Sequence, residues 1–350
     1  MPYHIERHQR KSLAIQAEKE AIVTWPDTSA FTRQLMIDGV IDSQEVTLTP
    51  LTGGVSSEIY LVQDAQKRFV VKRALPKLNV AADWYADTSR NAMEHAYIRY
   101  VGELLPDSVP RVTYANDQAG YFVMEYLEGF INWKQDLLAG RFDVEVAKMA
   151  GRILGKIHAS SWNDAGIAGQ FDAIENFDQL RIDPYLRATA AKHPAVSRQL
   201  LEEASRLRES RQCLMHGDYS PKNMLYQDQR LVILDCEVAC HGDAAFDLAF
   251  LLNHLTLKGL YHSPQRTTLP ALFEAASEAY MAEMGTLASP VLCSVTRLLP
   301  MLILARVDGK SPVEYLKPDE QAKAREFAIT HILKPQTDLS TLAQRWYDQL

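Results

Sequence analysis

The sequence predicts an α+β protein with two lobes, a small antiparallel β-sheet lobe followed by a larger, mainly helical lobe. Three observations lead to this prediction. Short runs rich in β-branched and aromatic residues, separated by turn residues, fill residues 46–73. Beyond residue 129 apolar residues recur at helical spacing, with one β-like interruption at 214–237. A length of 350 residues also favours two units over one.

Residues 1–45 are expected to form an N-terminal helical extension. Apolar positions recur among many charges over residues 5–24, and Trp25-Pro26-Asp27 ends that pattern. This region precedes the first β-rich run and shares none of its composition. We therefore assign it to neither lobe.

The sheet lobe is expected to occupy residues 46–128. Its first three runs, VTLTPL, EIYLVQ and RFVVKRA, predict an antiparallel meander, because each is bounded by a turn signal. Residues 88–105 have a helical composition, and YFVMEYL (121–127) predicts a further strand that ends near Gly129. We place the boundary between the lobes there.

The helical lobe is expected to occupy residues 129–350. Its clearest element is a core helix over residues 144–160, where apolar residues fall at three- and four-residue spacing on one face. These residues are Val146, Met149, Ile153, Leu154 and Ile157.

Composition limits the classes of function. Apolar residues make up 47% and charged residues 23%, as in ordinary globular proteins. The net charge of −7 disfavours a nucleic-acid partner, which would require a basic face. Four cysteines without a CxxC pair, and no recognisable secretory leader, favour a reduced, cytoplasmic setting. The longest apolar run, near Leu298 to Ala305, is too short to span a bilayer, so we expect no membrane role.

The interruption at 214–237 contains the residues that indicate chemistry. Two short apolar runs, 224–227 and 231–234, flank the turn Asp228-Gln229-Arg230 and predict a hairpin. Pairing across that turn puts Asn223 opposite Leu234 or Asp235, roughly 5 Å away. Amide and carboxylate oxygens are ligands suited to Mg²⁺. Asp218, on a Gly-Asp turn just upstream, is then placed to act as a general base.

The motifs HGDYSPKN (216–223) and ILDCE (233–237) resemble those of the aminoglycoside phosphotransferase/choline kinase superfamily, which shares the protein-kinase fold. The resemblance implies an ATP- and Mg²⁺-dependent kinase that phosphorylates the hydroxyl of a small metabolite or an aminoglycoside-like compound. Asp218 would accept the proton of that hydroxyl or orient it. Asn223 and Asp235 would hold Mg²⁺ on the β- and γ-phosphates.

The same resemblance assigns ATP-binding residues in the first half of the chain. Lys72 stands where the lysine of such kinases reaches the α- and β-phosphates, and Glu94, with Glu103 as second candidate, would pair with it. The backbone of Glu125 and Leu127 would bind adenine. Backbone N–H groups of the glycine-containing loop between the first two strands would approach phosphate. That loop contributes Gly53, Gly54, Ser56 and Ser57.

Two further acids near the motif are expected to have different roles. Asp247 lies in an apolar helical run, so its carboxylate should accept hydrogen bonds from the turn around His216. Glu237 follows Asp235 by two residues, and both metal contact and a supporting role stay open for it.

A narrower resemblance links residues 72–98 and 241–255 to the methylthioribose kinases, although those enzymes lack an asparagine at the position of Asn223. By this resemblance Arg306, near the end of an apolar helical run, would bind the acceptor. The alternative is that Arg306 stabilises the carbonyls at the end of its helix.

Two other functions are weighed against a kinase. His216, Cys236, Cys240 and His241 cluster in sequence, as in a zinc hydrolase, but their spacing lacks a second ligand pair. A catalytically silent nucleotide-binding regulatory protein is the other alternative. The presence of Lys72, Asp218 and Asp235 favours a working kinase.

Overall fold

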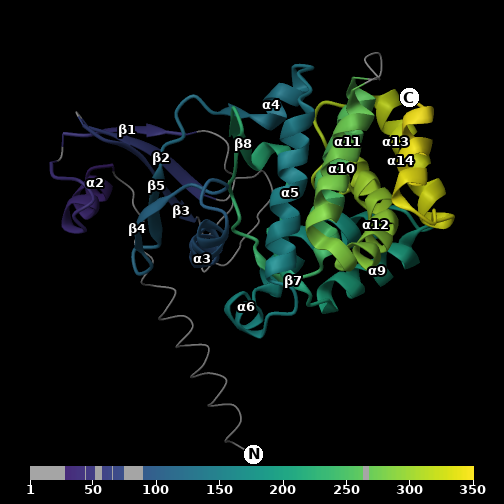
Figure 1. Cartoon of the computed structure of the whole chain (residues 1–350), viewed down its shortest axis with the longest axis horizontal. Coiled ribbons are helices and arrows are strands. Elements are labelled where there is room, and N and C mark those ends of the chain that lie inside the picture. The colour runs from purple at the N-terminus through teal and green to yellow at the C-terminus, as the bar shows by residue number, and fades with distance from the viewer. Residues whose placement is uncertain (1–27, 44, 52–56, 65, 75–89, 263–267) are drawn as a thin grey trace, which may run out of the picture.

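The computed structural model describes residues 28–43, 45–51, 57–64, 66–74, 90–262 and 268–350. Within them an antiparallel sheet lies at one end of the molecule and a group of long helices at the other (Figure 1). This is the predicted α+β arrangement. The expected helix at 5–24 and the loop residues Gly53, Gly54 and Ser56 lie outside the described residues.

The sheet has five strands in the order β1-β2-β3-β5-β4, all paired antiparallel. Their bounds are β1 Thr47–Pro50, β2 Ser57–Gln63, β3 Arg68–Ala74, β4 Val112–Asn116 and β5 Tyr121–Glu125. The predicted meander β1-β2-β3 and the predicted strand at β5 are confirmed. Strand β4 was not expected, because none of its five residues is fully buried and no clear alternation marks it.

Helices cover both faces of the sheet. Helix α2 (Thr28–Ile37), which lies within the helical extension predicted for residues 1–45, packs Phe31 and Leu35 against Val71 of β3. Helix α3 (Arg90–Leu104) packs Tyr97 and neighbouring apolar residues against the opposite face. Because side chains alternate along a strand, Lys72, one residue after Val71, points to the α3 face.

The helical part confirms the predicted core helix with its exact bounds. Helix α5 (Val144–Ser160) buries all five expected apolar residues. It packs closely on α11 (Leu269–Met284) through Gly151 and Gly155, where an added Cβ would lie 2.0 Å from the Ala276 carbonyl oxygen and 2.8 Å from that of Tyr280. Small residues at these two positions therefore allow the helices to touch (Figure 1).

The remaining helices surround this pair. Their bounds are α4 Trp133–Leu138, α6 Ala165–Gln170, α7 Ile174–Phe177, η1 Asp178–Arg187, α8 Ala188–Lys192, α9 Ser197–Glu209, η2 Pro221–Asn223, α10 Ala244–Tyr261, η4 Gly285–Leu287, α12 Ala288–Asp308, α13 Pro318–Leu333 and α14 Leu339–Asp348. Most are α-helices, but η1 is a ten-residue π-helix.

The β-like interruption is confirmed and is joined by two short strands that the sequence did not indicate. Strands β8 (Met224–Gln227) and β9 (Arg230–Ile233) form the predicted hairpin. Strand β6 (Ile131–Asn132) pairs with β8, and β10 (Cys240–Gly242) pairs with β7 (Cys213–Met215). Strands of two or three residues are too short to show a period.

The sequence analysis expected no apolar segment long enough to span a membrane, and one helical segment differs from that expectation. The stretch Leu269–Asp308 is long and apolar enough to cross a bilayer by length and composition, although 61% of its most apolar window is buried inside the protein. The core helix of a soluble protein passes the same test. The segment is therefore weak evidence for a membrane span.

Candidate active site

The turn that carries Asp218 is fixed by a buried carboxylate, as expected for Asp247. The backbone N–H groups of His216 and Gly217 donate to Asp247 at 2.7 and 2.9 Å. Gly217 has a φ of +75°, and a Cβ there would lie 2.7 Å from the Val238 carbonyl oxygen. Only glycine meets both conditions without strain.

His216 joins this turn to the segment that carries Asp235. Its Nδ1 accepts the backbone N–H of Asp218 at 3.1 Å, so its Nε2 holds the proton and donates to the Leu234 carbonyl at 3.0 Å. Burial lowers the pKa of His216, despite the carboxylates nearby. The imidazole is therefore a neutral structural link.

Asp218 is buried between two cations. Its Oδ2 lies 2.9 Å from Nη2 of Arg181 and 3.0 Å from Nζ of Lys222. Burial opposes ionisation of Asp218, but Arg181 and then Lys222 outweigh it and hold its pKa below the ordinary value. Asp218 is thus a stable anion, better suited to orienting a hydroxyl than to storing its proton.

The hairpin has the predicted register, and it brings the two proposed metal ligands together. Gln227 pairs with Arg230, and the Leu234 N–H donates to the Asn223 carbonyl at 2.9 Å. The Asn223 side chain donates through Nδ2 to the Asp218 carbonyl at 3.0 Å. Asp235 follows with a φ of +62°, a left-handed conformation that non-glycine residues seldom adopt. Such strain is common at functional sites.

The side chain of Lys72 connects strand β3 of the sheet to the segment that carries Asp235. Its Nζ lies 2.7 Å from Glu94 on α3, the predicted partner, and 2.6 Å from Asp235. Burial opposes the charge on Lys72, but Asp235 and Glu94 outweigh it and raise its pKa above the ordinary value. Burial also opposes the charge on Asp235, and Lys72 and Lys222 overcome it to lower that pKa. Burial raises the pKa of Glu94, whose pairing with Lys72 opposes the rise.

The donor set at Asp235 and Asn223 fits Mg²⁺. Nδ2 of Asn223 is used as a donor, which leaves its amide oxygen and the Asp235 carboxylate as hard ligands. Among the described residues no three His, Cys, Asp or Glu side chains converge as metal ligands, and Cys236 and Cys240 are buried. Glu237 is buried and acts electrostatically on Lys72 and Glu94, so its two roles stay open.

The two proposed adenine-binding residues lie where β5 ends. The Glu125 side chain accepts from Arg230 at 2.8 Å and from the Arg111 N–H at 3.1 Å. It is therefore occupied within the protein, which agrees with an adenine role for the backbone alone. Leu127 follows β5 and is half-buried, and its role stays a prediction. Ser57, the one described member of the predicted phosphate loop, is buried at the start of β2.

Arg306 does not cap its helix in the expected way. Its Nη1 donates to the Ser311 Oγ at 2.8 Å and to the Tyr185 hydroxyl at 3.3 Å, and it also bonds the Ser311 carbonyl. Ser311 lies beyond the end of α12, so the guanidinium holds the following loop rather than the last helical carbonyls. Its role toward an acceptor stays a prediction.

Like Lys222, Arg181 is a residue at this site that the sequence interpretation missed. It reaches Asp218 from the π-helix η1 and also donates through Nε to the Gly217 carbonyl at 2.7 Å. Nothing in the local pattern marked it, because it lies 36 residues from Gly217 in sequence. Long π-helices are rare and often occur at functional sites, but they have no simple sequence signature.

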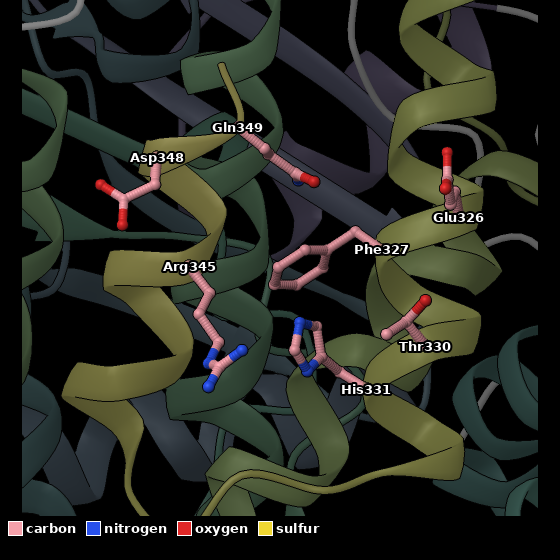
Figure 2. A pocket seen from close by; sticks show the side chains of 7 residues that line it. All are labelled: Glu326, Phe327, Thr330, His331, Arg345, Asp348 and Gln349. Atoms are coloured by element: carbon pink, nitrogen blue, oxygen red, sulfur yellow. The ribbon is translucent and has the colours of Figure 1, made fainter.

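A surface pocket lies between α13 and α14, away from the residues described so far (Figure 2). Phe327 and His331 lie side by side there, with ring centroids 4.2 Å apart, and Arg345 faces them from α14. None of the predicted site residues lines it. It is not part of the candidate active site.

Two solved kinases have a similar fold. A choline kinase from Cryptosporidium parvum Iowa II is 12% identical with a TM-score of 0.54, covering 92% of this chain and 97% of that chain. The amicoumacin kinase hAmiN, solved with AMP-PNP, Ca²⁺ and Ami, is 14% identical with a TM-score of 0.53, covering 95% and 97%. The chain therefore has a kinase-like fold.

The family follows from the sequence comparison. The model of the phosphotransferase enzyme family matches residues 47–287, and the chain belongs to this family. A methylthioribose kinase from Escherichia coli O45:K1 is 23% identical over 246 residues, which are 61% of this chain and 58% of that protein. The chain thus matches about three fifths of the length of such relatives.

Proposed function

We propose that this protein is an ATP- and Mg²⁺-dependent phosphotransferase that acts on a hydroxyl group of a small molecule. The observation that carries the proposal is the position of Asp235. Its carboxylate lies 2.6 Å from Lys72 and directly follows Leu234, whose N–H bonds the Asn223 carbonyl. A lysine for the α- and β-phosphates and two oxygen ligands for the metal thus meet at one place.

The nucleotide would lie between the sheet lobe (46–128) and the helical lobe (129–350). Lys72, held by Glu94, would contact the phosphates, and the loop with Gly53, Gly54, Ser56 and Ser57 would cover them. The backbone of Glu125 and Leu127 would bind adenine. Bound Mg²⁺ would neutralise the charge of the phosphates, with Asp235 and Asn223 as its protein ligands.

The acceptor hydroxyl would lie at Asp218. The acceptor oxygen gains the phosphoryl group, ADP leaves, and the hydroxyl proton passes to Asp218 or to solvent. Because Arg181 and Lys222 keep Asp218 anionic, its main contribution would be to align the hydroxyl for attack. Lys222 is also placed to favour negative charge on the transferred group.

The test is transfer of labelled γ-phosphate from ATP to pooled hydroxylated metabolites, including choline, methylthioribose and aminoglycosides, with and without Mg²⁺. We expect Mg²⁺-dependent transfer by the wild-type protein and loss of transfer in Asp218→Asn. Binding of MgATP without transfer or hydrolysis under any condition would instead support a silent nucleotide-binding protein.

A further inference from the structure

A buried lysine in the helical lobe forms no ion pair with any of the described residues. Lys258, on α10, is 0% exposed, and no described carboxylate forms an ion pair with it. Its one hydrogen bond within the described part of the chain is a long one, 3.4 Å, to the His254 carbonyl of its own helix, and its Nζ lies 5.3 Å from the centre of the Tyr315 ring. Burying an ammonium group without an ion-pair partner costs folding free energy. Packing alone therefore does not explain a lysine at this position.

Two more buried donors near Lys258 are unsatisfied among the described residues. Arg306 pairs with no described carboxylate, and its Nε is buried without a hydrogen-bond partner. The hydroxyl of Tyr315 is likewise buried and unpartnered. Native proteins rarely leave such groups unpaired unless a ligand or water completes them. All three groups can donate a hydrogen bond, and Lys258 and Arg306, which have no acceptor atoms, can be satisfied only by an acceptor.

The surrounding charge is positive. Lys134, Lys222, Lys258 and Arg306 all act on the buried imidazole of His254, whose pKa burial and these cations hold well below its ordinary value. Glu314 pairs with Lys134 at 2.6 Å, and Asp218 pairs with Lys222 at 3.0 Å. Glu314 also acts on Lys258 and Arg306 at longer range, but neither of these two cations forms an ion pair with a described carboxylate.

This cluster adjoins the catalytic turn through one face of α10. Asp247, which holds the turn, is followed at three- and four-residue intervals by Phe250, His254 and Lys258. The Lys258 side chain runs back toward His254, about 10 Å along the helix axis from Asp247. Asp247 in turn bonds the backbone of the turn that carries Asp218, so the same face of α10 serves both the turn and this cluster.

We propose that the acceptor is a hydroxylated small molecule that carries an anionic group, a carboxylate or a phosphate. Arg306 would bind the anion directly and Lys258 would supply positive charge behind it, while the hydroxyl lies at Asp218. This inference rests on the proposed phosphotransferase function and narrows its substrate class.

The experiment uses wild-type protein and matched pairs of acceptors that differ in charge. D-Gluconate is compared with gluconamide, and ribose 5-phosphate with ribose, with choline and kanamycin as cationic acceptors. Labelled γ-phosphate transfer from MgATP is measured for each. We expect kcat/KM at least about 10-fold higher for the anionic member of one pair, because hydrogen bonds to charged groups are the stronger ones. The pair that responds tells carboxylate from phosphate.

Variants test the assigned residues. Lys258→Met should raise KM for the preferred anionic acceptor about 10-fold and leave KM for ATP unchanged, whereas Lys323→Met, at an exposed position on α13, should change neither. Equal use of neutral or cationic acceptors by the wild-type protein overturns the inference without a variant, while the proposed function stands. Absence of transfer to every acceptor, together with absence of ATP hydrolysis, rejects the proposed function itself.

Discussion

Two buried lysines, one in each lobe, differ in the charges around them. Lys72 on β3 lies within 2.7 Å of two carboxylates, whose attraction outweighs burial and raises its pKa. Lys258 on α10 has no carboxylate partner among the described residues, and burial, Lys134 and Arg306 lower its pKa to about 7. Because both lysines are buried, the difference between their pKa values comes from the charged groups around them. Lys72 and its two carboxylates thus compensate each other's charge, whereas Lys258 and Arg306 form no ion pair with a described carboxylate.

Removing Asp235, one of the two carboxylates that pair with Lys72, should have the largest effect. Asp235→Ala removes one of the two carboxylates that pair with Lys72 and leaves the neutral Asn223 of the two proposed metal ligands, so Mg²⁺-dependent binding of ATP should be abolished. Asn223→Ala should be less severe. Calorimetry with MgATP checks both, with Asp107→Ala at an exposed position as control. Unchanged binding in Asp235→Ala would contradict the metal assignment.

Replacing Asp218 should affect turnover rather than nucleotide binding. Asp218→Asn keeps the shape of the side chain but removes the charge held by Arg181 and Lys222, so turnover should fall roughly 10²-fold or more with MgATP affinity nearly intact. Steady-state kinetics and calorimetry on the same preparation separate the two quantities. A turnover within a few fold of wild type would show that Asp218 is not the residue that meets the acceptor.

Replacing Arg306 tests the anion site proposed around Lys258 and Arg306. Arg306→Ala should raise KM for the acceptor about 10-fold and spare KM for ATP, while Arg297→Ala, exposed on the same helix, should change neither. A loss of about 1 kcal/mol of stability with unchanged acceptor kinetics would support a purely structural role through Ser311.

The smallest expected effect is a pH-dependent change in stability. The folded-state pKa of Lys258, about 7, lies below its ordinary 10.5, so between these values the unfolded chain binds a proton that the folded chain lacks. Wild-type stability therefore gains from rising pH across that window. The groups facing Lys258 are Lys134, Arg306, Glu314, His254 and Tyr315.

Lys258→Met removes this pH dependence of stability. The melting temperature of the variant should therefore exceed that of the wild-type protein near pH 6.5, and the difference should disappear by about pH 10. Scanning calorimetry without ligands checks the difference, and Lys323→Met should show none. A difference that is constant with pH would mean that Lys258 keeps its proton throughout.

Local sequence was sufficient to predict the part of the site built from neighbouring residues. A hairpin's register follows from its turn, which brought Asn223 opposite Leu234. An acid in an apolar helix must find donors, which predicted the contacts of Asp247 with His216 and Gly217. The Lys72–Glu94 pair came from the resemblance to kinases, and strand alternation then explains why Lys72 faces α3.

Tertiary structure alone decided the contacts between elements distant in sequence. Arg181 reaches Asp218 from a π-helix that no periodicity indicates, and Arg306 bonds Tyr185 across 121 residues. The sequence did not single out Lys258, because a sequence shows which residues are charged but not which charges lack a partner. That depends on the packing of α10 against α12 and the loop before α13, where the net charge of the site is set.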